Sequence, residues 1–521
     1  MKRYHIYGAA CCAALALASV TIGAAAGQSA PAPNASQIEQ QREIILRNVT
    51  VVDTVTGRLS RARDIVVRGS RIEAIRAARK SYPASARTVD GTGKFVVPGY
   101  NDMHVHSLTV AFPGRDDELR LLLANGITGF RQMSGTPALL KERREGKLTL
   151  FPHAPTALSM PGQVLMPLNA ANPAMATAEV RAQKADGVDF IKLVEADPAT
   201  FSAAAAEAKR QGLTIVGHLP DRIDVRTAAA AGFHSIEHMG PWATILTSCS
   251  TDEAGLRQAI AARPARQFGG SGNGEALPAA MLEKIITTAA AAPALTSMRT
   301  NPGFLPMLRR VIDTYDASKC AKVVADIKRS GAWMSPTLIR VKTSIFPDNP
   351  QFVQDPNLRY VAPAARALWL DLGKQFGAQA TATDRATLRD FWKLQLEVLK
   401  LFDQGGVPML AGSDTPGQWN VAGFSLHADF DLLAEAGVKP LKILQMTTLM
   451  PARFLGRTAT MGTVAAGRNA DLVLLDADPV ANAANLHRIR GVFREGQYYS
   501  REALDEMLAG VASRRATPGS N

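Results

Sequence analysis

The 521-residue sequence predicts an α/β protein built around a closed barrel of eight parallel strands. From residue 96 to about residue 455, short apolar segments alternate with alanine-rich segments of helical spacing, which is the pattern of βα units. Eight such apolar segments occur, the number that closes a TIM barrel. Short β-like segments, interrupted by glycines, stand before and after this region. We therefore predict a (β/α)8 TIM barrel with a small β-sandwich built from both chain ends and a helical insertion between barrel strands 6 and 7.

The composition is that of a folded protein, because 46% of the residues are hydrophobic and 20% are charged. The formal net charge of +13 raises the question of an anionic partner such as a nucleic acid. The sequence contains no run of five or more basic residues, and its densest basic group, between Arg61 and Lys80, is spread through predicted strands. We therefore interpret the charge as scattered and solvated, and we expect no nucleic-acid partner.

The first residues have the pattern of a signal peptide. Lys2 and Arg3 precede an apolar segment, residues 9–26, that closes on the small residues Ala24-Ala25-Ala26. We predict a signal peptide at residues 1–26, a periplasmic or secreted mature protein, and no stable membrane anchor after cleavage. The alternative is a membrane anchor, but the segment is short for a span and lacks a basic stop-transfer flank.

Four cysteines are present. Cys11 and Cys12 precede most of the apolar segment rather than following it, so we do not expect a lipoprotein signal. Cys249 and Cys320 remain in a compartment that permits disulfides, and the sequence leaves their pairing open.

The mature chain divides into three predicted parts. Residues 27–43, rich in proline and glutamine, are predicted to be a flexible lead-in. Residues 44–95 and 456–521 carry the β-like segments, and each half lacks partners for its edges, so we expect them to pair into one β-sandwich domain. Residues 96–455 are predicted to form the barrel domain.

The barrel elements follow from the hydrophobic pattern. Its eight strands are predicted at residues 96–104, 127–133, 155–160, 190–194, 214–219, 235–239, 333–338 and 408–414. The strongest helices are predicted at residues 203–211, 279–290, 317–330 and 386–404.

An insertion at about residues 240–332 separates the sixth and seventh strands, and it is several times longer than a connection needs. We expect it to lie over the mouth of the barrel. Its glycine-rich tract at residues 269–274 lacks the Lys-Ser/Thr ending and the preceding strand of a phosphate-binding loop, so we interpret it as a hinge or loop tip.

The most informative motif is a pair of histidines at the end of the first barrel strand. His104 and His106 are separated by one residue, so in an extended strand their side chains share a face and can hold one metal ion. Taken alone the motif is weak, and two half-buried strand histidines are an equal alternative. The partners of this pair on other strands therefore decide the interpretation.

Metal-ligand residue types recur at the carboxyl ends of the other strands, where TIM barrels place their working groups. They are Lys192 on the fourth strand, His218 on the fifth, His238 on the sixth and Asp414 on the eighth. His234 shares the face of His238 but stands roughly 13 Å deeper along the strand, too far to join such a site.

A lysine that points into a barrel mouth is unusual, because an isolated ammonium is costly to bury and repels cations. Lys192 fits if its amine has taken up carbon dioxide as a carbamate that bridges two divalent ions. The alternative is a lysine on the outer face of the barrel, paired with Glu195.

In the bridged arrangement His104, His106 and Asp414 hold one ion, and His218 and His238 hold the other. Two such ions, about 3.5 to 4 Å apart, share a hydroxide and polarise the carbonyl that it attacks. Asp414 is then the catalytic group that orients the hydroxide and carries its proton to the leaving amine.

These motifs resemble the amidohydrolase superfamily, and within it the secreted, imidazolonepropionase-like group that includes metal-dependent dipeptidases. The resemblance covers nearly the whole mature chain and is carried by Pro98-Gly99 through Asp102-x-His104-x-His106, Ile191-Lys192, Gly217-His218, Ile236-Glu237-His238, Ala411-Gly412-Ser413-Asp414, Ser425-Leu426-His427, Leu449-Met450-Pro451-Ala452-Arg453 and the tail motif Gly467 to Val473. It implies a barrel with a β-sandwich and the binuclear ligand set named above.

Two features depart from the family pattern. The insertion is longer than in compact members, so we expect a different substrate pocket. Related mononuclear deaminases place a glutamate three residues after the histidine of the fifth strand, where this chain has Asp221, and Lys192 has no role in such enzymes.

We therefore predict a metal-dependent hydrolase that cleaves an amide or peptide bond of a small substrate by a metal-bridging hydroxide. Its predicted cofactors are two divalent ions, with zinc expected although such ligands also accept manganese or cobalt, and carbon dioxide as the lysine carbamate. The alternatives are a mononuclear deaminase, a cyclic-amide or lactone hydrolase of the same fold, and a secreted binding protein without activity. Homo-oligomer formation is left open.

Two further residues are candidates near the site. Asp102 shares a strand face with His104 and is interpreted as a carboxylate that orients a histidine or stabilises the strand. His427 follows the eighth strand and is interpreted either as a packing residue or as a substrate contact.

Overall fold

The computed structural model describes residues 43–109, 114–148, 150–239, 243–263, 293–301 and 303–516. These residues belong to one compact unit, Arg42–Asn521. The predicted signal peptide, most of the predicted lead-in, the glycine-rich tract and the predicted helix at residues 279–290 lie outside the described residues. Among the described helices, none combines the length and the apolar character that crossing a membrane requires.

Both chain ends contribute to one eight-stranded sheet among the described residues, as the sequence predicts. Its order is β15 (Gln497–Ser500), β14 (Ile489–Arg494), β13 (Leu472–Leu475), β5 (Phe95–Pro98), β1 (Glu43–Val52), β2 (Leu59–Arg68) and β3 (Arg71–Ala77), with β4 (Arg87–Asp90) paired to β1. The sheet curls until β3 meets the segment before β13, through an antiparallel bridge between Arg71 and Asn469. Alternate apolar residues of these strands share an enclosed core of their own.

Parallel strands that follow one another around a ring form the barrel. They are β6 (Tyr100–Val105), β7 (Ile127–Gln132), β8 (Thr156–Ser159), β9 (Ile191–Leu193), β10 (Ile215–Gly217), β11 (Phe233–Glu237) and β12 (Trp333–Ser335). A parallel bridge from Pro161 to Phe190 joins β8 to the start of β9. Residues 408–415 supply the eighth position, with parallel bridges from Met409 to β12 and from Thr415 to β6. The predicted barrel order is therefore confirmed.

The first barrel strand begins later than predicted. The segment predicted as one strand at residues 96–104 is divided at Gly99, because β5 pairs with β1 and β13 in the terminal sheet while β6 pairs with β7 in the barrel. A Cβ atom at Gly99 would stand 2.1 Å from Thr128 Oγ1, so glycine is needed where the chain passes from one sheet to the other.

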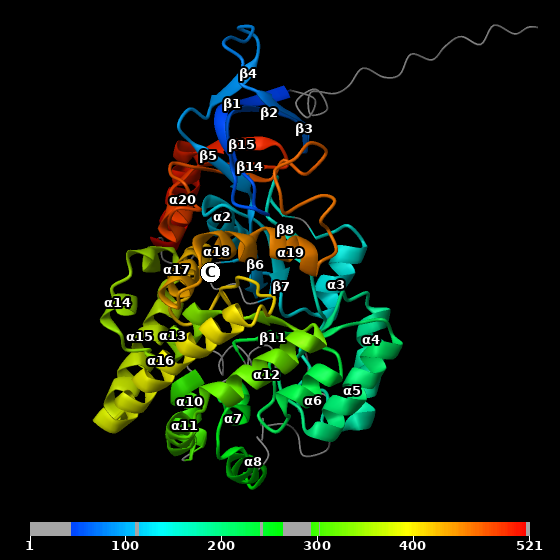
Figure 1. Cartoon of the computed structure of the whole chain (residues 1–521), viewed down its shortest axis with the longest axis vertical. Coiled ribbons are helices and arrows are strands. Elements are labelled where there is room, and N and C mark those ends of the chain that lie inside the picture. The colour runs from blue at the N-terminus through cyan, green and yellow to red at the C-terminus, as the bar shows by residue number, and fades with distance from the viewer. Residues whose placement is uncertain are drawn as a thin grey trace, which may run out of the picture. The chain divides into compact units, whose positions relative to one another are not determined.

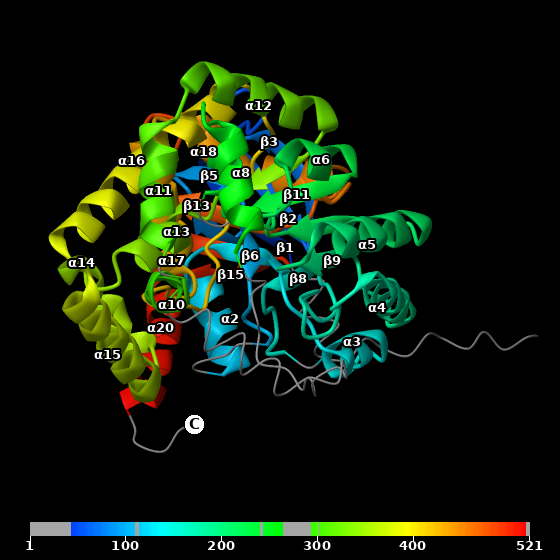
Figure 2. The same cartoon turned by 90° about the horizontal axis from the view of Figure 1, so that it is seen from below.

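Helices surround the barrel strands (Figure 2). Those that follow β6 to β10 are α2 (Arg115–Ala124), α3 (Pro137–Arg144), α4 (Pro173–Ala185), α5 (Pro198–Arg210) and α6 (Val225–Ala230). Those after β12 are α13 (Leu338–Ile345), α14 (Pro350–Val353), η1 (Pro356–Tyr360), α15 (Pro363–Gln379) and α16 (Ala382–Gln404). The helices that follow the eighth strand position are α17 (Phe424–Glu435), α18 (Pro440–Thr447), α19 (Leu449–Phe454), η2 (Ala483–His487) and α20 (Arg501–Ala516).

Several of these helices begin where the sequence offers a capping side chain. Asp197 precedes α5, and its carboxylate accepts hydrogen bonds from the backbone N–H groups of residues 199 and 200. Thr381 starts α16 with a reciprocal pair of hydrogen bonds to Asp384. The predicted helices at residues 203–211 and 386–404 therefore exist and begin a few residues earlier.

The insertion is helical where it is described. It contains α7 (Thr244–Ser248), α8 (Glu253–Ala261), α10 (Pro293–Thr300), α11 (Phe304–Asp313) and α12 (Ala317–Ser330), and α11 and α12 pack against α16. A disulfide joins Cys249 to Cys320 and so connects the end of α7 to α12. Figure 1 shows α7, α8, α10 and α11 at the end of the barrel opposite the terminal sheet. Because β6 leaves that sheet at its amino end, these four helices lie toward the carboxyl ends of the barrel strands, the side on which we expected the insertion.

Candidate metal centre

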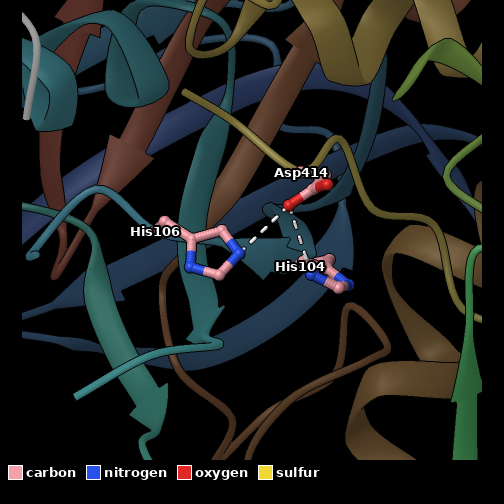
Figure 3. A group of neighbouring side chains, drawn as sticks. All are labelled: His104, His106 and Asp414. Carbon is pink, nitrogen blue, oxygen red and sulfur yellow. Dashed lines mark ion pairs between the residues drawn. The ribbon is translucent and has the colours of Figure 1, made fainter. Parts of the chain in front are cut away.

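Two strand ends place three potential metal ligands together at the carboxyl end of the barrel (Figure 3). Asp414 Oδ1 lies 3.0 Å from His106 Nε2 and 3.3 Å from His104 Nε2. A Cβ atom at Gly412 would stand 2.8 Å from His104 Cβ. Glycine at this position thus allows the segment that carries Asp414 to approach β6.

His238 and His218 complete a row of imidazoles. The ring centroids of His104 and His238 are 4.7 Å apart, and those of His238 and His218 are 4.9 Å apart. Gly217, just before His218, has φ 135°, and a Cβ atom there would stand 2.1 Å from the Leu193 carbonyl oxygen. The strands that carry Lys192 and His218 can approach closely only because this position is glycine.

Two of the site residues adopt left-handed backbone conformations. His238 has φ 58° and Asp414 has φ 57°, values that are uncommon for residues with a Cβ atom. Such conformations cost about 1 to 3 kcal/mol each and persist only where the surrounding structure fixes them. At both positions the chain leaves its strand, so the turn aims the side chain into the barrel mouth.

His104 is held by a buried charge network. Its Nδ1–H donates to Glu237 Oε2 at 2.7 Å, and Arg131 Nη2 donates to Glu237 Oε1 at 2.8 Å. All three side chains are fully buried. Burial alone would raise the pKa of Glu237, but Arg131 and His104 hold it well below its usual value. An ionised Glu237 therefore fixes the His104 tautomer that turns the Nε2 lone pair toward Asp414.

Hydroxyl groups fix two further histidines in the same tautomer. Thr337 Oγ1 donates to the preceding carbonyl, so it accepts from His238 Nδ1 at 2.6 Å. Thr109 donates to a carbonyl and accepts from Ser134, whose oxygen accepts from His106 Nδ1 at 2.8 Å. Both histidines therefore present an unprotonated Nε2 on the side of Asp414.

Lys192 lies inside the barrel, with 1% of its surface exposed. Within the described residues its Nζ has no hydrogen-bond partner. Burial lowers the pKa of Lys192 to about 8, an effect that Glu237 and Asp414 partly oppose. The alternative of a lysine on the outer face, paired with Glu195, is therefore wrong.

The charge state of the site suits divalent cations. Burial lowers the pKa of His106, and lowers those of His218 and His238 well below the usual value, so these imidazoles are neutral. Burial opposes ionisation of Asp414, but the neighbouring imidazoles hold its pKa well below the usual value. His104 Nε2 is buried without a hydrogen-bond partner among the described residues. Neutral imidazoles, an ionised carboxylate and unsatisfied buried nitrogens are a donor set that fits divalent metals.

The two additional candidates occupy different places. Asp102 is fully buried and accepts hydrogen bonds from Ser413 N at 3.0 Å, Ser413 Oγ at 2.5 Å and His104 N at 3.1 Å. It thus joins the backbones on either side of the site through Ser413 and the backbone N–H of His104.

His427, on α17, lies away from the site. It packs edge-on against Tyr100 at the opposite end of β6, roughly 13 Å along the strand from His104, and hydrogen-bonds the Asn125 carbonyl at 2.9 Å. These contacts favour the packing interpretation over a substrate contact.

Two residues that we expected to lie outside the metal site, His234 and Asp221, do lie outside it. His234 stacks on Phe454, with ring centroids 4.9 Å apart, and does not reach the row of imidazoles. Asp221 lies 3.3 Å from Arg263 in an ion pair, so its carboxylate is occupied outside the ligand group formed by His104, His106 and Asp414.

Sequence patterns did not indicate two arginines of this region. Arg131 stands in a strand whose residues are all buried, and a cation at such a position requires a buried carboxylate partner. The strand itself does not show which carboxylate that is. Arg340, on α13, places Nε 3.2 Å from Asp414 Oδ2 and is nearly buried. No sequence motif indicates Arg340, because its approach to Asp414 depends on the path of the chain after β12.

Comparison with known proteins gives a family match over part of the chain. Residues 393–498 match the amidohydrolase family. The chain is 25% identical over 212 residues to adenine deaminase 2 of Bradyrhizobium sp. (strain ORS 278) and 24% identical over 217 residues to adenine deaminase of Chelativorans sp. (strain BNC1). Each match covers 36% of this chain and 34% of the relative, so the chain spans about a third of the length of the curated relatives it matches.

Solved structures share the fold over most of the chain. Bottromycin amidohydrolase has a TM-score of 0.62 and 19% identity, over 91% of this chain and 90% of that protein. A Xaa-Pro dipeptidase with methionine bound in its active site has a TM-score of 0.56 and 16% identity, over 88% of this chain and 100% of that protein. Residues 393–498 therefore resemble the amidohydrolase family, and the chain as a whole shares the fold of these solved structures.

Proposed function

We propose that this chain is a metal-dependent hydrolase that cleaves an amide or peptide C–N bond of a small substrate with two divalent ions. One observation carries the proposal: the barrel mouth gathers neutral histidines, an ionised aspartate and a buried lysine amine without a hydrogen-bond partner among the described residues. That combination costs stability unless a cationic group compensates it.

The proposed ligands follow the grouping predicted from the sequence. His104, His106 and Asp414 would hold one ion, His218 and His238 would hold the other, and Lys192 as a carbamate would supply an anionic ligand to both. The ions supply Lewis acidity, which activates water near neutral pH and polarises the scissile carbonyl. Zinc suits the imidazole and carboxylate donors, and manganese or cobalt also fit them.

Asp414 carries the proton in this mechanism. Its pKa lies well below the usual value, so it is ionised at neutral pH and can accept a proton from the attacking water. A C–O bond then forms at the substrate carbonyl, and the C–N bond breaks as Asp414 returns the proton to the leaving nitrogen. Glu237 and Arg131 keep His104 oriented throughout, because their ion pair is fully buried.

Lys192 is suited to form the carbamate. A pKa of about 8 leaves a substantial neutral fraction near pH 7.5, and the neutral amine is the form that attacks carbon dioxide. The new N–C bond forms with release of one proton, and the product is an anion. Replacing a cation by an anion inside the site removes the repulsion between Lys192 and two dications.

A mononuclear deaminase is the alternative, and two observations favour it. The partial match to adenine deaminases is one, and the close grouping of His104, His106 and Asp414 is the other. One observation opposes the deaminase alternative. Related deaminases have a glutamate three residues after the fifth-strand histidine, and this chain has Asp221 there, whose carboxylate pairs with Arg263 instead.

Metal content separates the two proposals. We expect the purified, metal-loaded chain to contain two divalent ions and to hydrolyse members of a panel of dipeptides and N-acyl amino acids, and chelation should abolish turnover while far-UV circular dichroism is unchanged. Lys192→Ala should lose bound metal and activity, and acetate or formate should partly restore both. Lys184→Ala, which removes an exposed lysine from α4, is the matched control. A Lys192→Ala variant that keeps two ions and full turnover would refute the binuclear proposal.

We also propose a periplasmic or secreted location. The support is the pattern of residues 1–26 and the disulfide between Cys249 and Cys320, since disulfides persist in oxidising compartments. Sequencing the amino terminus of protein recovered from the periplasmic and culture fractions tests it, with cleavage expected near residue 26.

A further inference from the structure

An acidic side chain that the proposed mechanism does not use is buried on α17. Asp429 is fully buried, and its Oδ1 accepts a hydrogen bond from the backbone N–H of Ile339 at 3.1 Å. The backbone N–H of Leu338 also interacts with this carboxyl group. Leu338 and Ile339 are the first two residues of α13, which packs against α17 (Figure 1). Asp429 therefore caps α13 from a neighbouring helix.

The start of α13 needs such an external cap. A helix leaves its first N–H groups without partners in the helix, and a buried N–H without a partner costs stability. The residue in the N-cap position is Thr337, and its side chain makes no capping hydrogen bond. Thr337 and Leu338 are fully buried and Ile339 is 5% exposed, so bulk water does not reach these N–H groups. The carboxyl group of Asp429 thus takes the place of the usual cap.

Thr337 does not cap α13 because its hydroxyl group is committed to His238. Oγ1 donates to the Pro336 carbonyl at 2.9 Å and accepts from His238 Nδ1 at 2.6 Å. Thr337 also has a left-handed backbone conformation with φ 43°, which is rare for a β-branched residue and persists only where the surrounding contacts fix it. Threonine is a common N-cap residue, so without Asp429 the helix N–H groups would compete with His238 for the same hydroxyl.

We propose that Asp429 is a positioning residue of the metal centre, which caps α13 and so keeps the Thr337 hydroxyl on His238. This inference rests on the proposed function, in which His238 is a metal ligand. Asp429 supplies an acceptor oxygen rather than a charge. Burial raises the pKa of Asp429 to about 8, so the group is mostly protonated at pH 7, and an amide of the same shape should replace it.

Three variants separate a cap from a side chain that only fills space. Asp429→Asn keeps an acceptor oxygen and should bind metal like the wild type, because asparagine caps helices as well as aspartate does. Asp429→Leu has no acceptor and should weaken metal binding by about 10- to 100-fold, the range for losing a group that orients a metal-binding histidine. Asp431→Leu, the same substitution at an exposed position of α17, is the matched control. The measurement is competition with a chromophoric chelator, and far-UV circular dichroism shows which variants are folded.

A cycle of single and double variants tests the route through Thr337. Thr337→Val removes the hydroxyl and keeps the shape, so it should weaken metal binding by a similar factor. Adding Asp429→Leu to Thr337→Val should change the affinity by less than about twofold, because the hydroxyl that Asp429 protects is already absent. The Gly412 N–H also interacts with the Asp429 carboxyl group, and this contact offers a second route, to Asp414. Losses that multiply would show that second route, and the inference would be wrong.

Hydrogen exchange of the metal-free chain reports the cap without any metal. Peptides that cover residues 338–341 should exchange at least about tenfold faster in Asp429→Leu than in the wild type or Asp431→Leu. Unchanged exchange in Asp429→Leu would contradict the cap. If Asp429→Leu does not fold, Asp429→Ala takes its place in every comparison.

The metal measurements distinguish this inference from the proposed function. A wild-type chain with two ions, together with an Asp429→Leu variant that binds them equally well, would overturn the inference and leave the proposed hydrolase intact. Equal losses of affinity in Asp429→Asn and Asp429→Leu would also overturn it, because the amide keeps the capping oxygen. A wild-type chain that binds no divalent metal would overturn the proposed function and this inference with it.

Discussion

Replacing Glu237 by glutamine tests the buried charge network beneath the site. The substitution keeps the volume and one acceptor oxygen but removes the negative charge that compensates Arg131, whose side chain is fully buried. At 2.8 Å and an effective dielectric constant of about 20, the attraction between Arg131 and Glu237 is about 6 kcal/mol before desolvation is subtracted. Breaking buried pairs costs about 3 to 5 kcal/mol, because the remaining charge has no counterion. We expect the same loss here.

The assay is urea unfolding of the metal-free chain at pH 7, followed by tryptophan fluorescence. Glu43→Gln is the matched control, because Glu43 pairs with Arg68 at 3.1 Å on the exposed surface and should contribute less than about 1 kcal/mol. We also expect Glu237→Gln to weaken metal binding by about 10- to 100-fold, because His104 loses the carboxylate that orients it. If Glu237→Gln unfolds within about 1 kcal/mol of the wild type, the ion pair does not supply the stabilisation assigned to it.

Burial raises the pKa of Glu118 to about 8 from 4.5, so its protonated form stabilises the fold below pH 4.5, and this stabilisation is lost as the pH rises to about 8. The loss should be about 1.4 kcal/mol per pH unit, and Glu118→Gln should flatten the profile of unfolding free energy between pH 5 and 8; an unchanged profile would contradict the shift. Replacing Cys249 and Cys320 by serine should cost about 2 to 4 kcal/mol, because the disulfide closes a loop across a sequence separation of 71. The reduced wild-type chain should match that double variant, and a chain that is insensitive to reduction would exclude the contribution. Asp102→Asn should weaken metal binding by about 10- to 100-fold in competition with a chromophoric chelator, because Asp102 holds the backbone before Asp414; complete loss of metal would instead indicate a ligand.

The sequence alone determined much of the site, because its geometry there is local. Alternate residues of a strand share a face, so the spacing of His104 and His106 was sufficient to place both on one side of β6. The carboxyl ends of parallel strands meet at one end of a barrel. Asp414 could therefore be assigned to the same place as His106, although it stands 308 positions later in the chain. Strand periodicity and barrel topology are properties that a single sequence carries.

Only the tertiary structure decided which groups surround these candidate ligands. Arg131 and Glu237 meet across the barrel, and Arg340 reaches Asp414 from a helix, through contacts that depend on strand register and on the path of a loop. The division of the first strand at Gly99 has the same origin, since it depends on which sheet each half pairs with. Long-range pairing is set by packing and twist summed over the whole barrel, and no local pattern in the sequence records it.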